Sequence, residues 1–311
     1  MHMNPHPPAA RTQSRRPVPS AAAIPLALLV QLSGCSNGVL DPQGPVGAAN
    51  KLILLNSLAI MLAIVVPTIL AALVFAWWFR ASNTRAIYRP DWAYSGRIEL
   101  IVWSIPIMII LFLGGITWVG SHDLDPAQPI ASQSKPVEVQ VVSLDWKWLF
   151  IYPDLHIASV NQLVVPAAVP VHFALTSASV MNSFFVPQLG SMIYTMNGMV
   201  TQLHLLADHE GDFFGESAMF SGDGFSDMHF IMRAVSADDF TKWTSTVQQT
   251  GPALDPSEYS RLAQQSQNVQ PFTYRSIDPG LFHAVVTQQI PPGPGPQEGR
   301  GDPTVHPRGG K

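Results

Sequence analysis

Cysteine and charge are both scarce in this chain. It has one cysteine among 311 residues, and only 12% of its residues are charged. A single cysteine excludes a disulfide framework and thiolate clusters such as zinc ribbons or iron–sulfur sites. Soluble domains carry roughly 25% charged residues, so the low charge argues against a soluble enzyme. The net charge is −4 and no long basic run occurs, which argues against a nucleic-acid-binding protein.

Long apolar runs take the place of the missing charge, since 47% of the residues are hydrophobic. Two of these runs, 52–79 and 100–119, hold no charged residue. Each is long enough to cross a hydrocarbon core of about 30 Å, which needs roughly 20 residues. We therefore predict two transmembrane helices within residues 51–122, over about 52–79 and 99–120. Tryptophans lie towards the ends of these runs, as in aromatic belts: Trp77, Trp78, Trp103 and Trp118.

The first 34 residues have the features of a signal peptide. Arg11, Arg15 and Arg16 precede a short apolar run over 21–32, which is too short to span a bilayer. The following Leu-Ser-Gly-Cys sequence, ending at Cys35, resembles the lipobox of bacterial lipoproteins. This resemblance implies cleavage before Cys35 and acylation of its thiol. Residues 35–50 then form a short extracytoplasmic segment.

Arginines predict the orientation of the hairpin. The loop between the two spans holds four of them, at positions 80, 85, 89 and 97, against two acidic residues. The positive-inside rule places this loop in the cytoplasm. Cys35 and everything after the second span then lie outside, which agrees with the lipobox.

Residues 136–235 have the pattern of a β-domain. Val137, Val139 and Val141 alternate with polar residues, and Val171, Phe173 and Leu175 do the same. Residues 201–206 and 229–235 are further short β-like runs between turn residues. Many short strands in about 100 residues predict a β-sandwich or barrel.

The rest of the chain divides into two parts. Residues 236–285 are polar with scattered aromatic residues, which pack either on the β-domain or on a partner; the sequence leaves both open. Residues 286–311 are rich in proline and glycine and predict a disordered tail.

Metal ligands are the only candidate chemistry within the β-domain. No histidines stand at helical pair spacing, and no Gly-x-Ser-x-Gly or phosphate loop occurs. His172 and His204 alternate out of phase with the apolar residues, so we expect both to face solvent. We interpret the methionines as packing residues. The domain thus holds no recognisable catalytic site of its own.

Three motifs carry a family resemblance. They are Asp145-Trp-Lys-Trp148 running to Tyr152, Met181-Asn-Ser-Phe-Phe-Val-Pro-Gln-Leu-Gly190, and Gly215-Glu-Ser-Ala-Met-Phe-Ser-Gly222 followed by Phe225 and Met228. Together with the lipobox and two spans, they resemble subunit II of the haem–copper terminal oxidases, in the ubiquinol-oxidase branch of the cytochrome bo type. The resemblance covers roughly residues 30 to 285. It implies a cupredoxin fold for 136–235, and hence a membrane-anchored α+β protein.

The chain departs from this family at the dinuclear copper centre of its cytochrome c oxidase members. There the family has two cysteines, two histidines and a methionine, with one backbone carbonyl. The matching positions here are Asn182, Ser217, Met219, Ser221, Phe225 and Met228. A serine hydroxyl stays protonated at neutral pH and cannot replace a thiolate towards copper. We therefore expect no metal at this site.

The resemblance implies a role without electron transfer through this chain. Ubiquinol is membrane-soluble and can reduce haem in the membrane directly, so no copper entry site is needed. The family's haems, its active-site copper (CuB) and its quinol site belong to subunit I. The expected partners are subunit I, subunits III and IV, ubiquinol and membrane lipid, in a bacterial inner membrane. The complex would reduce oxygen to water and pump protons.

Glu99 stands at the start of the second span. A glutamate at the matching position of the family lies near the mouth of a proton-uptake channel, which implies proton entry here. An acidic residue at a helix N-terminus is also favoured by the helix dipole alone, by about 0.3–1 kcal/mol. For the whole chain one alternative stays open. It is a free-standing membrane lipoprotein that binds periplasmic copper through its methionines and histidines.

Overall fold

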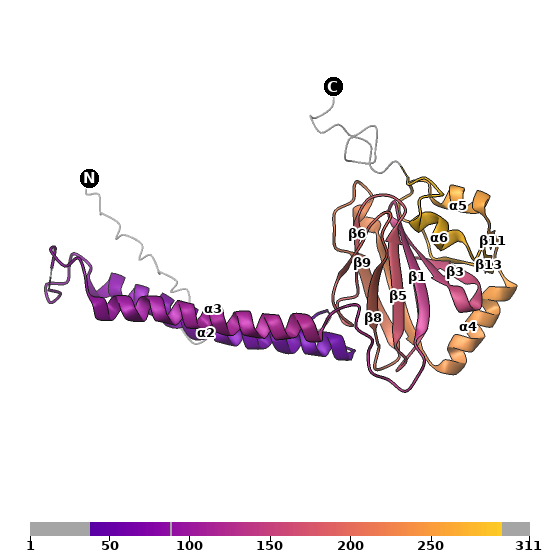
Figure 1. Cartoon of the computed structure of the whole chain (residues 1–311). Helices are drawn as coiled ribbons and strands as arrows, with labels where there is room; N and C mark the ends of the chain where they lie inside the picture. Colours follow the sequence, from indigo (N-terminus) through magenta and orange to yellow (C-terminus); the bar gives the residue numbers. More distant parts are fainter. Residues whose placement is uncertain (1–37, 88, 294–311) are drawn as a thin grey trace, which may run out of the picture. The chain divides into compact units, whose positions relative to one another are not determined.

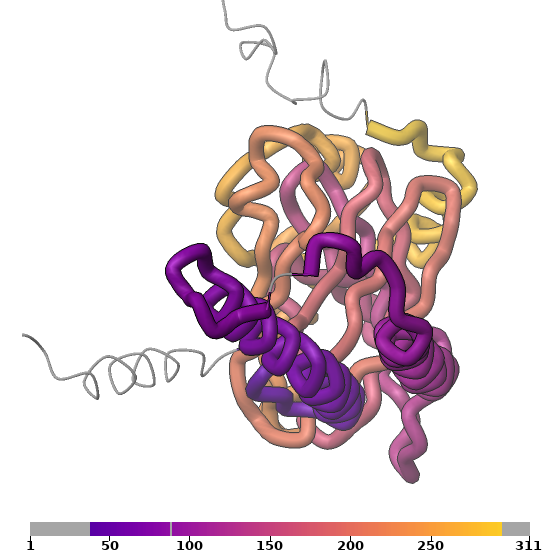
Figure 2. The backbone as a smooth tube through the Cα atoms, turned by 90° about the vertical axis from the view of Figure 1, so that its left-hand side faces the viewer, coloured from indigo at the N-terminus to yellow at the C-terminus, as the bar shows by residue number. Residues whose placement is uncertain are grey.

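The computed structural model describes residues 38–87 and 89–293, beginning with two long helices (Figure 1). Helix α2 spans Pro45–Trp78 and α3 spans Gly96–Asp123. Both are long and apolar enough to cross a membrane, and their most apolar windows are not buried within the chain. They contact each other where the side chain of Ile53 lies beside Gly120. Figure 2 looks along the two helix backbones from their loop end. The two predicted spans are therefore present as helices.

Helix α2 begins at Pro45, before the predicted start at residue 52, because its first turn contacts the β-domain. The Gly47 N–H donates to the Leu189 carbonyl at 3.0 Å, and the Gln43 N–H donates to the Gln188 carbonyl at 2.8 Å. First-turn N–H groups have no partner inside a helix, so an external carbonyl stabilises this end. A Cβ at Gly44 would lie 2.1 Å from the Leu206 carbonyl oxygen, so only glycine permits the close approach.

Two sheets pack face to face after the helices (Figure 1). The first has the order β12-β3-β2-β1-β5-β8, from Phe272–Tyr274, Ile157–Val160, Lys147–Tyr152, Val137–Leu144, Val171–Ser177 and Thr201–Leu205. The second has the order β4-β10-β9-β6-β7, from Gln162–Pro166, His229–Val235, Gly211–Ser217, Asn182–Phe185 and Ile193–Thr195. The pairs β1–β5 and β4–β10 are parallel and the others antiparallel. The four β-like runs expected from the sequence are β1, β5, β8 and β10.

The main core lies between these two sheets. It is centred on aromatic rings: Trp148 and Phe150 of β2 contact Phe184 of β6 and Phe230 of β10, with ring centroids 5.1–6.4 Å apart. The alternating apolar residues of β1 and β5 face into the same core. This two-sheet sandwich is the cupredoxin-like architecture that the family resemblance implied.

A second core covers the outer face of the first sheet. Alternate residues of β1 and β2, including Val142 and Leu149, pack against the C-terminal region. That region holds α5 (Pro256–Leu262), α6 (Leu281–Val286) and the short pair β11–β13 (Ala253–Leu254 and Ser276–Ile277). Its buried aromatic residues are Tyr259, Tyr274 and Phe282. Of the two alternatives left open, these aromatics pack on the β-domain.

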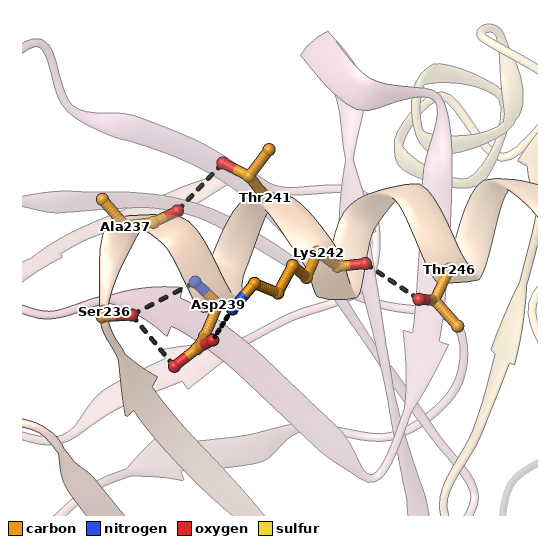
Figure 3. A network of polar contacts seen from close by, with 6 residues as sticks. All are labelled: Ser236, Ala237, Asp239, Thr241, Lys242 and Thr246. Carbon is orange, nitrogen blue, oxygen red and sulfur yellow. Dashed lines mark hydrogen bonds and ion pairs between the residues drawn. The ribbon is translucent and has the colours of Figure 1, made fainter.

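Helix α4, Ala237–Gln249, closes one side of the main core through Trp243, which lies 5.4 Å from Tyr152 ring to ring. Its N-terminus has a side-chain cap (Figure 3). The Ser236 hydroxyl accepts the Asp239 N–H at 3.1 Å, and Lys242 pairs with the Asp239 carboxylate at 2.8 Å. An N-cap serine satisfies a first-turn donor that would otherwise lack a partner. The chain turns from β10 into α4 at this point.

Candidate functional site

The positions that hold copper in cytochrome c oxidases come together at one end of the sandwich. Asn182 begins β6, Ser217 ends β9, and the 218–228 loop brings Ser221 and Met228 beside them. The Ser217 hydroxyl donates to Asn182 Oδ1 at 3.2 Å, and the Ser221 hydroxyl lies 4.0 Å from Met228 Sδ. These four residues are buried. The sequence motif thus identified a real spatial cluster.

Two further positions of the motif lie at the rim of this cluster. The Met219 carbonyl accepts a second contact from the Ser217 hydroxyl, at 3.3 Å. Phe225 is half-buried and packs edge-on against the exposed ring of Phe220, with centroids 5.6 Å apart. Its ring therefore belongs to the outer face of the loop.

A tryptophan and a glycine fix the conformation of the loop. The Trp146 indole N–H donates to the Ser221 carbonyl at 3.2 Å, and the same ring packs directly on Gly224. A Cβ on Gly224 would lie 2.4 Å from the indole, so this position requires glycine. Gly222 has a φ of +118°, which other residues rarely adopt. The loop keeps a defined shape without any metal ligand.

The side chains at this site do not fit a dinuclear copper centre. They offer one amide, two hydroxyls, one buried thioether and a phenyl ring, and the two hydroxyls already make hydrogen bonds. Copper in such a centre needs thiolates and imidazoles. Across the part of the chain that the structure describes, no group of three or more His, Cys, Asp or Glu residues is placed to hold a metal ion. We therefore derive no redox step through this site.

The prediction that His204 faces solvent is wrong, and His172 is only partly exposed. His204 is 7% exposed, and the His172 side chain is 22% exposed. The reason is the segment that follows α3, which runs along the edge strand β8. There the Pro126 carbonyl accepts the His204 backbone N–H at 3.0 Å. Burial lowers the pKa of His204, although the Pro126 carbonyl acts in the opposite direction.

Sequence reasoning also missed a buried lysine. Lys147 is 1% exposed, and its ammonium group donates to the Gln264 carbonyl at 2.7 Å and to the Ser266 hydroxyl at 2.6 Å. Burial lowers its pKa to about 8, while the nearby Asp145 carboxylate acts to raise it. These bonds attach the C-terminal region to the β1–β2 turn. The sequence did contain a sign that Lys147 is buried, because this lysine stands between two tryptophans.

The two remaining predicted site residues lie apart from this cluster. Glu99 is exposed in the first turn of α3, and no hydrogen bond or ion pair of its side chain occurs among the described residues. Its backbone N–H donates to the Ser95 carbonyl at 3.0 Å. Cys35, with the predicted signal peptide, lies outside the described residues.

Comparisons with known proteins place the chain in a family. Residues 153–235 match the family described as "Cytochrome C oxidase subunit II, periplasmic domain", and residues 248–293 match the "COX Aromatic Rich Motif". The second match coincides with the region that forms the second core. The chain is thus membrane-anchored with a periplasmic domain.

Two relatives with high sequence identity agree with these matches. Ubiquinol oxidase subunit 2 of Acetobacter aceti is 51% identical over 259 residues, which cover 83% of this chain and 84% of the relative. Cytochrome bo(3) ubiquinol oxidase subunit 2 of Pseudomonas aeruginosa is 48% identical over 263 residues, covering 85% and 80%. The periplasmic domain of cytochrome oxidase subunit II from Bradyrhizobium japonicum aligns over 38% of this chain and 98% of its own, with 23% identity and a TM-score of 0.36. From its identity to the first two, the chain belongs to the ubiquinol oxidase subunit 2 family.

Proposed function

We propose that this chain is a non-redox subunit of a proton-translocating ubiquinol oxidase and carries no electrons itself. The observation that supports this most is the cluster of Asn182, Ser217, Ser221 and Met228, whose two hydroxyls donate to neutral acceptors within the cluster. A cytochrome c oxidase uses copper at these positions to receive electrons from a water-soluble donor. Ubiquinol reaches the membrane subunit through the bilayer, so its oxidation leaves this domain without an electron-transfer task.

The role left to the chain is structural. The haems, the active-site copper and the quinol site belong to subunit I in this proposal, and subunits III and IV complete the complex. The two apolar helices anchor the periplasmic domain and offer an unburied surface to a membrane partner. The alternative of a free-standing copper lipoprotein is not favoured, because the relatives cited above are oxidase subunits.

Purification of the complex through a tag on this chain tests the proposal. In mild detergent we expect haem-containing subunits to co-purify, and the preparation to reduce oxygen with ubiquinol. The Met228→Leu variant should leave the copper-to-haem ratio unchanged, since Met228 is the one residue of the copper motif that remains. A chain that purifies alone, or a complex that oxidises cytochrome c but not ubiquinol, would refute the proposal.

Glu99 is proposed as a proton-entry residue at the cytoplasmic face. Its carboxylate stands in the first turn of α3, next to the arginine-containing loop, and is exposed with no partner among the described residues. An acid in that position can exchange protons with bulk water and pass them to a channel in subunit I.

Cys35 is proposed as a lipidated N-terminus after signal cleavage. The support is the sequence alone, in which the lipobox-like site ends at the only cysteine. With the arginine-containing loop in the cytoplasm, α2 crosses the membrane inwards and α3 crosses outwards. Cys35 and the periplasmic domain then lie on the same side of the bacterial inner membrane.

A further inference from the structure

The loop between α2 and α3 forms a pocket with walls of two kinds (Figure 1). Its volume is about 740 Å³, within the range of roughly 300–1,000 Å³ that is usual for ligand sites. Two of the lining residues are the arginines Arg80 and Arg89. Most of the others are apolar, and the large ones are Phe79, Ile87, Trp92 and Ile98. Such a pocket suits a ligand that is anionic at one end and apolar at the other.

Two tight turns hold the backbone of the arginines in place. The Asn83 N–H donates to the Arg80 carbonyl at 2.9 Å, and the Trp92 N–H donates to the Arg89 carbonyl at 3.3 Å. Each arginine therefore stands at the first position of a hydrogen-bonded turn. The Asn83 side-chain amide also donates to the carbonyl of Trp78, the last residue of α2, at 2.5 Å. The loop is thus attached to the end of the helix and has a defined fold of its own.

The charge of the two arginines is not neutralised by the chain. In the part that the structure describes, no carboxylate lies within ion-pair distance of either guanidinium group. Arg80 Nε donates to the Ser82 hydroxyl at 3.0 Å, and its Cζ lies 5.2 Å from the centre of the Trp77 ring. Both partners are uncharged. The guanidinium groups are therefore available to an external anion.

The position of the loop along the chain places this pocket at a membrane surface. The two spans flank it, and the domain after α3 is periplasmic, so the loop lies at the cytoplasmic face. Over residues 79–99 four arginines stand against two acidic residues, which leaves a net charge of +2. Basic pockets beside membrane spans on this side bind the head groups of anionic lipids. Guanidinium groups match phosphate oxygens through paired hydrogen bonds.

We propose that this pocket binds one anionic phospholipid of the cytoplasmic leaflet. The phosphate lies between Arg80 and Arg89, and the glycerol and upper acyl region contact Phe79, Ile87 and Ile98. A soluble phosphate would leave these apolar side chains uncovered, which favours a lipid. Because Phe79 follows α2 and Ile98 belongs to α3, the lipid would connect the cytoplasmic ends of the two spans. The site depends on the orientation of the hairpin and not on a role in electron transfer.

Lipid titration of the full chain in detergent tests the proposal. Native mass spectrometry counts the bound lipids while phosphatidylglycerol, or zwitterionic phosphatidylcholine as the reference, is added. The wild type is compared with Arg80→Gln, Arg89→Gln and Arg85→Gln. Arg85 is the matched control, because it is an exposed arginine of the same loop that does not line the pocket. A further sample contains excess glycerol 3-phosphate, which has the phosphate chemistry without acyl chains.

We expect the wild type to bind one phosphatidylglycerol at least about tenfold more tightly than phosphatidylcholine, since each arginine near the surface contributes about fivefold. Arg80→Gln and Arg89→Gln should each weaken binding of phosphatidylglycerol by about fivefold, and Arg85→Gln should bind like the wild type. Glycerol 3-phosphate should not displace the lipid. Both lining arginines are exposed, so neither substitution removes a buried group.

Three results would overturn the proposal. Equal affinity for the two lipids would show that the arginines do not select an anion. A loss in Arg85→Gln as large as in Arg80→Gln and Arg89→Gln would show attraction by the whole loop without a defined pocket. Displacement by glycerol 3-phosphate would show a site for soluble phosphates.

Discussion

Ser217 and Ser221 show how few atoms separate a copper site from a site without metal. Each serine differs from cysteine by one atom, and the surrounding loop is held by contacts that do not depend on that atom. The Trp146 indole and Gly224 fix the loop from outside, and the Ser183 hydroxyl accepts the Ala218 N–H at 2.8 Å. The conformation of the loop is therefore expected to survive replacement of the ligand residues.

A fourfold substitution tests this independence. One variant combines all four substitutions: Asn182→His, Ser217→Cys, Ser221→Cys and Phe225→His. We expect it to bind copper and turn purple, because all side-chain ligands of the family are then present around the remaining Met228. A visible spectrum with intense thiolate-to-copper bands would confirm it. The same substitutions without Ser221→Cys provide the control and should give no dinuclear spectrum. A fully folded fourfold variant that stays colourless would show that the loop geometry differs from the family's.

Lys147 makes stability depend on pH in an unusual direction. Its pKa is about 8 in the folded chain, below its ordinary value of 10.5. Between these two values the unfolded state binds more protons, so the free energy of unfolding rises as pH increases from 8 towards 10.5. Below pH 8 both states are protonated and this dependence disappears.

The Lys147→Met variant should therefore lose this rise, which amounts to about 3 kcal/mol over the whole window. Thermal unfolding in detergent between pH 7.5 and 9.5 measures it. Lys135→Met is the matched control, because Lys135 is exposed and pairs with the exposed Asp154. A wild-type slope no steeper than that of Lys147→Met would contradict the burial of this charge.

Strand β2 shows which elements the sequence predicts well and which it does not. Strands β1, β5, β8 and β10 coincide with runs recognised in the sequence, and the alternation of β5 agrees with its burial pattern. All six residues of β2 are buried, because one face packs in the main core and the other under the C-terminal region. Burial on both faces removes the alternation that identifies a strand, and so β2 was visible only as a motif.

The same limit applies to the candidate site. The spacing of Asn182, Ser217, Ser221 and Met228 was sufficient to predict their clustering, because it is the spacing of a known motif. The environment of His204 was not predictable, since it depends on a contact with Pro126, 78 positions earlier in the chain. Local periodicity cannot report which segment covers the polar face of an edge strand.

The second core should contribute to the stability of the whole periplasmic domain. Leu149 is fully buried on the outer face of β2, against the C-terminal region. Leu149→Ala is expected to lower the free energy of unfolding by about 2–5 kcal/mol, as for other large-to-small substitutions in cores. Chemical denaturation monitored by tryptophan fluorescence measures the change. Val200→Ala, at an exposed position, should have little effect. A small effect of Leu149→Ala would mean that the C-terminal region packs loosely.

For the whole molecule, the two helices are expected to be a sufficient membrane anchor. Two spans of about 20 apolar residues insert effectively irreversibly, whereas acyl chains add about 0.8 kcal/mol per buried CH₂. Cys35→Ala should therefore lose labelling by a radioactive fatty acid and remain in the membrane fraction. The wild type labelled in parallel is the control. Recovery of Cys35→Ala in the soluble fraction would contradict the assignment of α2 and α3 as spans.

The proton-entry role of Glu99 is a property of the assembled complex and is tested by turnover. Glu99→Gln keeps the shape and removes the acid, whereas Glu99→Asp keeps the acid and shortens its reach. A unique general acid or base is worth roughly 10²–10⁴-fold. Water and neighbouring carboxylates can replace an entrance residue in part, so we expect only a several-fold loss of ubiquinol-driven oxygen reduction per haem in Glu99→Gln. The loss in Glu99→Asp should be smaller.

The loss of turnover in Glu99→Gln should shrink as pH falls, because protons become more abundant. Asp91→Asn, which removes an exposed acid from the same loop, should turn over like the wild type. A purely structural Glu99 at the α3 N-terminus would instead lower the amount of assembled complex, by the loss of about 0.3–1 kcal/mol of dipole stabilisation, and leave turnover per haem unchanged at every pH.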